Sequence, residues 1–204
     1  MMTYSWLNTP ASEVSATARA LLGWHIAANG VRIRLTGVEA YSGPGVDPAS
    51  HAYRGQTRRN AVMFGPAGYL YVYFIYGTHW CLNIVCGPAG EAAAVLLRAG
   101  DVVEGIELAR RRRPTARNDA DLARGPAKLA TALGVDGSAN GTCVVDGTGP
   151  VTLTPPTSPV AAEQISAGPR VGVTAAHDLL WRFWITGDPT VSAYRPHIPR
   201  RRRR

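Results

Sequence analysis

The chain has 204 residues, of which 46% are hydrophobic and 18% are charged, a composition typical of folded globular proteins rather than disordered ones. This length fits one large domain or two small ones and buries a core without disulfide or metal support. The longest apolar and aromatic run, from Tyr69 to Tyr76, is too short to cross a bilayer. Because the chain has three cysteines and no recognisable signal sequence, we expect a cytoplasmic protein without disulfides.

Basic residues outnumber acidic ones, 22 to 14, which gives a formal net charge of +8. Five of the arginines form the terminal run Arg200–Arg204, which we expect to be a disordered tail with nonspecific affinity for polyanions. The body of the chain, residues 1–199, is therefore only mildly basic. Lys128 is its single lysine.

The first third of the chain predicts a helix and then extended chain. Pro10 follows Thr9 where proline favours a helix start, apolar residues recur on one face, and Gly23 ends the helix. Apolar and polar residues alternate between residues 24 and 39, as in a strand with one buried face. Residues 42–66 are polar and rich in glycine and proline, which is typical of a functional loop or of a disordered segment.

The centre of the chain predicts a β-hairpin over residues 69–86 that is rich in aromatic residues. Tyr71 and Tyr73 share one strand face, so that face can present phenol rings while the other packs in the core. Ordinary sheet packing is also typical of aromatic strands. Tyr76, however, precedes Gly77 at the tip, where burial is difficult, and an aromatic side chain there is a candidate wedge for a stack of bases.

The second half of the chain predicts alternating short elements. These are a strand at 92–98, a helix at 101–113, a helix at 126–133, short strands and turns at 136–170, and closing strands at 171–173 and 181–186. Asp101 and Glu104 form the capping-box pattern that predicts the start of the first of these helices. Gly134 closes the second helix. Together these elements predict one mixed α/β domain over residues 1–199.

Glu39 is the first candidate catalytic residue. It lies at a predicted strand end and on the same face as Tyr41, so its carboxylate could act as a general base beside a flat ligand. A solvated glutamate at a sheet edge is the more common situation. Arg98 ends an apolar run, where a cation is usually paired, either with Glu39 or with another carboxylate.

A metal site is not predicted. His79 and Cys81 share a strand face, but Cys86 falls on the opposite one, and no CxxC or HxxxH spacing accompanies them. We expect neither a metal nor any other cofactor.

Several blocks of sequence follow one another in a diagnostic order: residues 38–44, 49–51, 59–64, 70–77, 81–83, 95–99, 124–129 and 170–173. In this order they resemble the alkyladenine (3-methyladenine) DNA glycosylase family over nearly the whole chain. The resemblance implies a single α/β (α+β) domain with a curved antiparallel sheet, flanking helices and a protruding β-hairpin. It also implies a monomeric DNA-repair enzyme that acts on double-stranded DNA containing damaged purines and has no membrane partner.

The resemblance assigns roles to individual residues. It implies that Tyr76 intercalates while a damaged nucleotide rotates into a pocket, where Glu39 activates a water that Arg98 and the carbonyl of Val171 help to hold. It further implies three base-stacking residues, Tyr41, His51 and Tyr73, and one residue that excludes guanine, Asn83. We also expect Lys128 to contact a phosphate, because it lies at the start of a predicted helix whose free amides suit an anion. Three further contacts to the DNA backbone are expected, from Arg59, Thr78 and His79. The chain departs from the family pattern by an extra residue between Tyr41 and His51 and by Thr78 in place of a methionine.

The chemistry fits these implied roles. An alkylated purine is cationic and leaves readily, so a positioned water and a carboxylate suffice, and electron-rich phenol rings attract the flat cation. With a single lysine the chain offers few amines for a Schiff base, and we expect a monofunctional glycosylase without AP-lyase activity.

Two other functions remain as alternatives. A noncatalytic nucleic-acid-binding module of similar fold would use the tyrosines and the basic surface alone, but it would gain nothing from Glu39. A metal-dependent nuclease needs a cluster of carboxylates, and Glu39 with Asp47 is too few.

Overall fold

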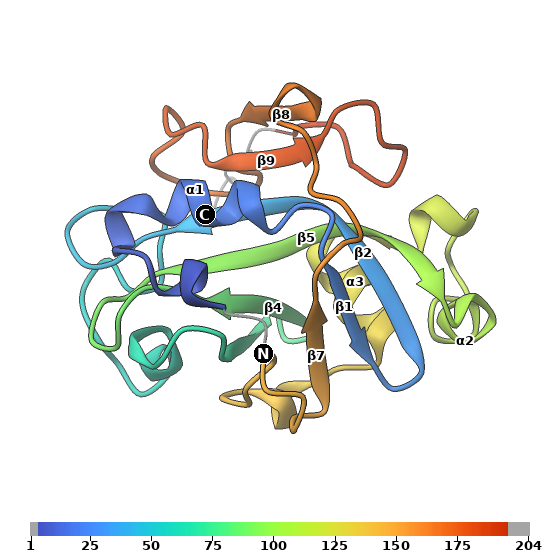
Figure 1. The fold of residues 1–204 in the computed structure, drawn as a ribbon, viewed down its shortest axis with the longest axis horizontal. Helices are drawn as coiled ribbons and strands as arrows, with labels where there is room; N and C mark the ends of the chain where they lie inside the picture. The colour runs from blue at the N-terminus through green and yellow to red at the C-terminus, as the bar shows by residue number, and fades with distance from the viewer. Residues whose placement is uncertain (1–3, 196–204) are drawn as a thin grey trace, which may run out of the picture.

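The computed structural model describes residues 4–195, and the predicted tail, Arg200–Arg204, lies outside the described residues. The expected fold class is confirmed. Within the described range nine strands form one open antiparallel sheet in a single mixed α/β domain with three α-helices (Figure 1).

The sheet has one main path and one branch. The main path is β3 (Leu70–Ile75), β4 (His79–Val85), β5 (Ala94–Glu104), β2 (Val31–Tyr41), β1 (His25–Ala28) and β7 (Val151–Thr154). The branch strands are β6 (Ala123–Arg124) beside β5, and β9 (Arg182–Ile185) between β2 and β8 (Ile165–Gly168).

The long strand β2 changes partners along its length, and this change curves the sheet. Its first part pairs with β1, whereas Gly37 to Glu39 pair with β9. Register shifts against β5 occur on both sides of Gly37, and such bulges bend a strand. The carboxyl-terminal end of β2, which carries Glu39, is therefore enclosed by β5 on one side and β9 on the other.

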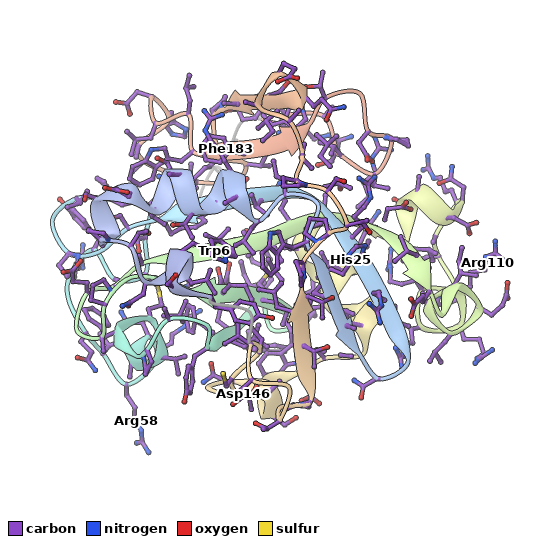
Figure 2. The ribbon with its side chains drawn as sticks, viewed as in Figure 1. Trp6, His25, Arg58, Arg110, Asp146 and Phe183 are labelled. Atoms are coloured by element: carbon purple, nitrogen blue, oxygen red, sulfur yellow. The ribbon has the colours of Figure 1, made fainter. Side chains whose placement is uncertain are left out.

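The helices cover the sheet. They are α1 (Val14–Ala20), α2 (Ile106–Arg112) and α3 (Pro126–Leu133), with 3-10 turns η1 (Ser5–Asn8), η2 (Ala11–Glu13), η3 (Ala61–Phe64), η4 (Asp119–Asp121), η5 (Gly137–Ala139) and η6 (Ala162–Gln164). In Figure 1, α1 runs across the front of the sheet beside β2 and β5. Figure 2 shows Phe183 of β9 next to α1, and the guanidinium of Arg19 lies 4.3 Å from the centre of its ring.

The two faces of the β3–β4 hairpin differ as predicted. Leu70 and Val72 are buried in the main core. Tyr71 and Tyr73 instead belong to a second, smaller cluster under the loop of residues 42–66, which contributes Ala52 and Met63. The loop therefore covers the tyrosine face and leaves a space beside it.

Two predicted elements are wrong. Asp101 and Glu104 do not start a helix, because β5 continues through Glu104 in register with β2, and α2 begins only after Gly105, whose φ is +73°. Residues 171–173 form bends instead of a strand. The extended segment at 24–39 is two strands, joined by an Asn29-Gly30 turn with both φ angles positive, as expected of a tight hairpin turn.

Candidate active site

A pocket of about 400 Å³ opens where the loop of residues 42–66, the β3–β4 hairpin and the segment of residues 171–174 meet. Nine of the predicted site residues line it: Glu39, Tyr41, His51, Tyr73, Tyr76, His79, Asn83, Arg98 and Val171. They come from β2, β3, β4, β5 and three connecting segments, so the fold brings together residues that are far apart in the sequence. Arg59, Thr78 and Lys128 lie outside the pocket lining.

Glu39 is fully buried and its carboxylate has two hydrogen-bond donors. The hydroxyl of Tyr41 donates to Oε2 at 3.0 Å, and the peptide N–H of Val171 donates to Oε1 at 2.9 Å. Hydrogen bonds of this kind stabilise the charged form of a buried carboxylate. Glu39 is thus built into the pocket wall, and the solvated sheet-edge position is excluded.

Arg98 lies against Glu39, so Glu39 and not another carboxylate is its partner. Its Nε is 3.3 Å from Oε1 of Glu39. The two groups are not aligned for a hydrogen bond, and within the described residues this Nε has no hydrogen-bond partner. Arg98 therefore supplies compensating charge to the carboxylate and keeps one N–H free beside it.

Arg182 is a second cation near Glu39, and sequence reasoning missed it. It faces Glu39 in the β2–β9 pairing and is buried, and burial is the main cause that lowers its pKa, followed by the charge of Arg98. The only sequence signal was an arginine inside a predicted strand, which normally indicates an exposed face.

Neutral aromatic rings form the pocket wall. Burial raises the pKa of Tyr73 and the pKa of Tyr41 far above that of a free phenol, and the negative charge of Glu39 raises the pKa of Tyr41 further. Burial also raises the pKa of Tyr71 to about 12. All three phenols are therefore uncharged at neutral pH and present electron-rich faces.

His51 lies at the rim of this wall. Its Nδ1 is 3.0 Å from the hydroxyl oxygen of Tyr71, and its ring meets Tyr73 edge-on with centroids 4.6 Å apart. Partial burial lowers the pKa of His51, and the neighbouring Arg59 lowers it further. Tyr71 is thus the residue that orients His51. The sequence placed Tyr71 on the strand face of Tyr73 but indicated no separate role for it in the site.

Asn83 is buried and fixed in the pocket. Its Nδ2 donates to the carbonyl oxygen of Tyr71 at 3.0 Å across the β3–β4 ladder. This bond sets the orientation of the side-chain amide, which gives the pocket one rigid polar group among the rings.

The tip of the hairpin is exposed and conformationally unusual. Tyr76 is 83% exposed and has a φ of +54°, a left-handed conformation that is rare for a bulky residue. Thr78 and His79 are exposed on the returning side. Arg59 lies along the hairpin and donates to the carbonyl of Phe74 at 3.3 Å.

A larger groove of about 920 Å³ adjoins the pocket and shares His79, Arg98, Ala127 and Val171 with it. Six cations line this basic groove: Arg98, Arg113, Arg117, Arg124, Lys128 and Arg195. Among the groove-lining residues in the described range, Asp121 is the single carboxylate, and it forms an ion pair with Lys128. Lys128 therefore already has a partner, which the sequence did not predict.

Within residues 4–195, no three His, Cys, Asp or Glu side chains are grouped so that they would bind a metal ion. The helices of this part of the chain are also too short or too polar to cross a membrane.

Comparison with known proteins gives a consistent result. Residues 8–189 match the family described as Methylpurine-DNA glycosylase (MPG). A protein of Streptomyces avermitilis is 60% identical over 176 residues, which are 85% of this chain and 81% of that protein. A protein of Nocardia farcinica is 55% identical over 188 residues, 89% of this chain and 88% of its own length. Both are named "Putative 3-methyladenine DNA glycosylase". This chain belongs to the methylpurine-DNA glycosylase family.

Proposed function

We propose that this protein is a DNA-repair glycosylase that releases 3-methyladenine and related damaged purines from double-stranded DNA. The observation that carries the proposal is the buried Glu39 carboxylate, held by Tyr41 and Val171 in a pocket lined by neutral aromatic rings. Family membership and the names of the relatives support the same activity. We expect a monomer that acts on chromosomal DNA in the cytoplasm.

The pocket suits a flat cation taken out of the base stack. Rotating a nucleotide out of duplex DNA costs about a few kcal/mol, and this cost is smallest for a damaged or mispaired base. The faces of Tyr41 and Tyr73 offset part of this cost, since a cation over such a ring gains about 0.5–2 kcal/mol. The neutral state of His51 also favours the cation, because a charged imidazole beside it would repel it.

The exposed Tyr76 is proposed to fill the gap that the rotated nucleotide leaves. Bulky residues with positive φ persist where the surrounding structure holds them, and they concentrate at functional sites. Such an aromatic side chain at a protruding turn inserts between base pairs, as apolar wedges do in other minor-groove binders.

Hydrolysis then needs a base and a water. Glu39 accepts a proton from the water, the water oxygen bonds to C1′ of the sugar, and the N-glycosidic bond breaks with its electron pair moving to the purine. The cationic purine leaves as a neutral molecule. The negative carboxylate also stabilises the positive charge that develops on the sugar, and the unpaired N–H of Arg98 and the carbonyl of Val171 are proposed to hold the water.

Two further roles follow from the same geometry. Asn83, fixed by its bond to the Tyr71 carbonyl, is proposed to exclude normal guanine by crowding its amino group. The cations of the basic groove other than Arg98, with Arg59, Thr78 and His79, are proposed to contact phosphates on either side of the rotated nucleotide.

Release of free base from methylated DNA tests this function. DNA treated with dimethyl sulfate is incubated with the protein, and the soluble products are separated by chromatography. The proposal predicts free 3-methyladenine and intact strands that break only after alkali. A noncatalytic binding module of the same fold would retain the DNA and release no base, and this result would exclude the proposed function.

A further inference from the structure

A buried ion pair lies directly behind the pocket. Arg170 is fully buried, and its two terminal nitrogens donate to the two carboxylate oxygens of Asp47 at 2.6 and 2.7 Å. One of these nitrogens also donates to the carbonyl of Ala40 at 2.9 Å. Neither Arg170 nor Asp47 lines the pocket.

Arg170 is connected to Glu39 in two ways, through Tyr41 and through the backbone of Val171. Its guanidinium lies 4.6 Å from the ring centre of Tyr41, whose hydroxyl donates to Oε2 of Glu39. The next residue in the chain, Val171, donates its N–H to Oε1 of the same carboxylate. The side chain of Arg170 therefore fixes the ring that carries one donor, and its backbone carries the other.

Asp47 is connected to the opposite wall of the pocket through the backbone of the 42–49 turn. Besides Arg170, it accepts the backbone N–H of Ser42 at 3.2 Å and that of Ala49 at 3.1 Å. These bonds close the turn that begins after Tyr41 and leads to His51. The carboxylate of Asp47 thus connects Arg170, which holds the two donors to Glu39, with the loop that carries His51.

We propose that Arg170 and Asp47 are positioning residues for base excision, which hold the Glu39 carboxylate, Tyr41 and the turn before His51 in one fixed arrangement. The role rests on the proposed function, because it is a role in that reaction. Arg170 and Asp47 do not touch the base. They act through the residues that line the pocket.

The geometry of the pair explains why other side chains would not serve. Arginine alone combines a planar face that stacks on Tyr41 with a fork of donors that matches both oxygens of Asp47. Replacement of a buried ion pair by apolar residues is often neutral or stabilising for the fold. Stability and positioning can therefore be separated by experiment.

The test compares three variants with wild type: Asp47→Asn, Arg170→Lys and the apolar double variant Arg170→Met/Asp47→Leu. The rate of 3-methyladenine release from methylated DNA is measured at saturating enzyme. Affinity is measured separately with a duplex that carries a tetrahydrofuran abasic analogue, which has no base to release. All measurements are made below the unfolding midpoint of every variant.

We expect Asp47→Asn and the double variant to lower the saturated rate about tenfold to a hundredfold, since small displacements of reacting groups have effects of this size. Affinity for the abasic analogue changes about threefold or less, because the groups that contact the DNA backbone are untouched. Arg170→Lys keeps the charge but loses the fork and the stacking, so its rate lies between those of wild type and the double variant.

Asp188→Asn is the matched control. Asp188 also accepts from an arginine, Arg34 at 3.0 Å, and from the backbone N–H of Thr190 at 3.0 Å, but it lies outside both the pocket and the basic groove. Its substitution is expected to lower the unfolding temperature and leave the saturated rate unchanged.

Each outcome is decisive. Wild-type rates in Asp47→Asn and in the double variant, with an active wild type, overturn the positioning role alone. An equal loss of rate in Asp188→Asn also overturns it, because the effect would then be one of general stability. A wild-type protein that releases no base overturns the proposed function and this role with it.

Discussion

The peptide N–H of Val171 donates to Oε1 of Glu39, a residue 132 positions earlier in the chain. This bond joins the end of β2 to a segment that has no regular secondary structure. The hydroxyl of Tyr41 supplies the second donor from within β2. The hydrogen bonding of the Glu39 carboxylate is therefore complete only when the segment of residues 171–174 lies against the sheet, and the candidate active site depends on the tertiary structure.

Tyr76→Ala is expected to weaken capture of the damaged nucleotide more than it slows hydrolysis. Base–aromatic stacking contributes about 1–3 kcal/mol, so the enzyme concentration for half-maximal release rises about 5- to 150-fold. Titration of methylated DNA with enzyme measures this change, and saturating enzyme restores most of the rate. Tyr76→Phe keeps the ring and serves as the control. A low rate that persists at saturation would show that Tyr76 acts in another step.

Lys128 and Asp121 form a charge pair in the basic groove, so their substitutions are expected to have opposite effects on DNA binding. Lys128→Ala weakens binding to all sequences and lowers the slope of log affinity against log salt by about one. Asp121→Asn removes the competing carboxylate and raises both affinity and slope. Binding of undamaged duplex over a range of salt concentrations measures both.

Neither of these two variants should alter the choice of lesion. Phosphate contacts position a protein on DNA without reading the bases. A changed ratio of released bases in Lys128→Ala would contradict a role limited to the backbone, and an unchanged slope would show that Lys128 stays paired with Asp121 on DNA.

Acid conditions are expected to weaken capture of a cationic base through His51. Burial and the charge of Arg59 lower the pKa of His51 below the usual histidine value of about 6.5. His51 is therefore neutral at neutral pH and takes up a proton only under more acidic conditions. Its charged form repels the cationic purine. The release rate at subsaturating enzyme therefore falls more steeply below this pH in wild type than in His51→Gln. Identical pH profiles for the two proteins would contradict this role.

The lowered pKa of His51 also affects the stability of the folded protein. The unfolded chain takes up a proton at His51 at a higher pH than the folded protein does, so the free energy of unfolding decreases as the pH falls through this window. Thermal unfolding over the acid range measures the effect, which should be smaller in His51→Gln.

Strand cleavage is expected to require alkali because a lyase needs an amine nucleophile. Lys128 is the single lysine of the chain, and its ammonium is paired with Asp121. Borohydride added during the reaction should trap no covalent protein–DNA adduct. An adduct that forms with wild type and disappears in Lys128→Ala would replace the Glu39-activated water with an amine mechanism.

Local sequence signals predicted the elements that short-range rules govern. Pro126 and Gly134 bound α3 as expected, because proline suits the first helical position and glycine adopts the left-handed cap. The alternation in β3 correctly divided the hairpin into an apolar core face and a tyrosine face. The short-range capping pattern at Asp101 failed because pairing of β5 with β2 overrode it.

Nine of the residues that line the pocket were predictable from the sequence, but the bonds that connect them were not. Glu39 and Tyr41 are two residues apart on one strand, so their shared face was visible in the sequence. The bonds from Val171 to Glu39 and from Arg170 to Asp47 span more than a hundred residues, and no periodicity encodes them. Arg170 in particular is a charged residue in the core, a position that composition rules assign to apolar side chains.

The saturated rate of 3-methyladenine release by Glu39→Gln tests the central claim most directly. Glutamine keeps the size of the side chain and a carbonyl oxygen that accepts one of the two hydrogen bonds made to Glu39, but it does not take a proton from water. The account predicts that release of 3-methyladenine from methylated DNA is abolished while the affinity for lesion DNA is unchanged or higher. Release by Glu39→Gln at a rate near that of wild type would contradict the assignment of Glu39 as the base that activates water.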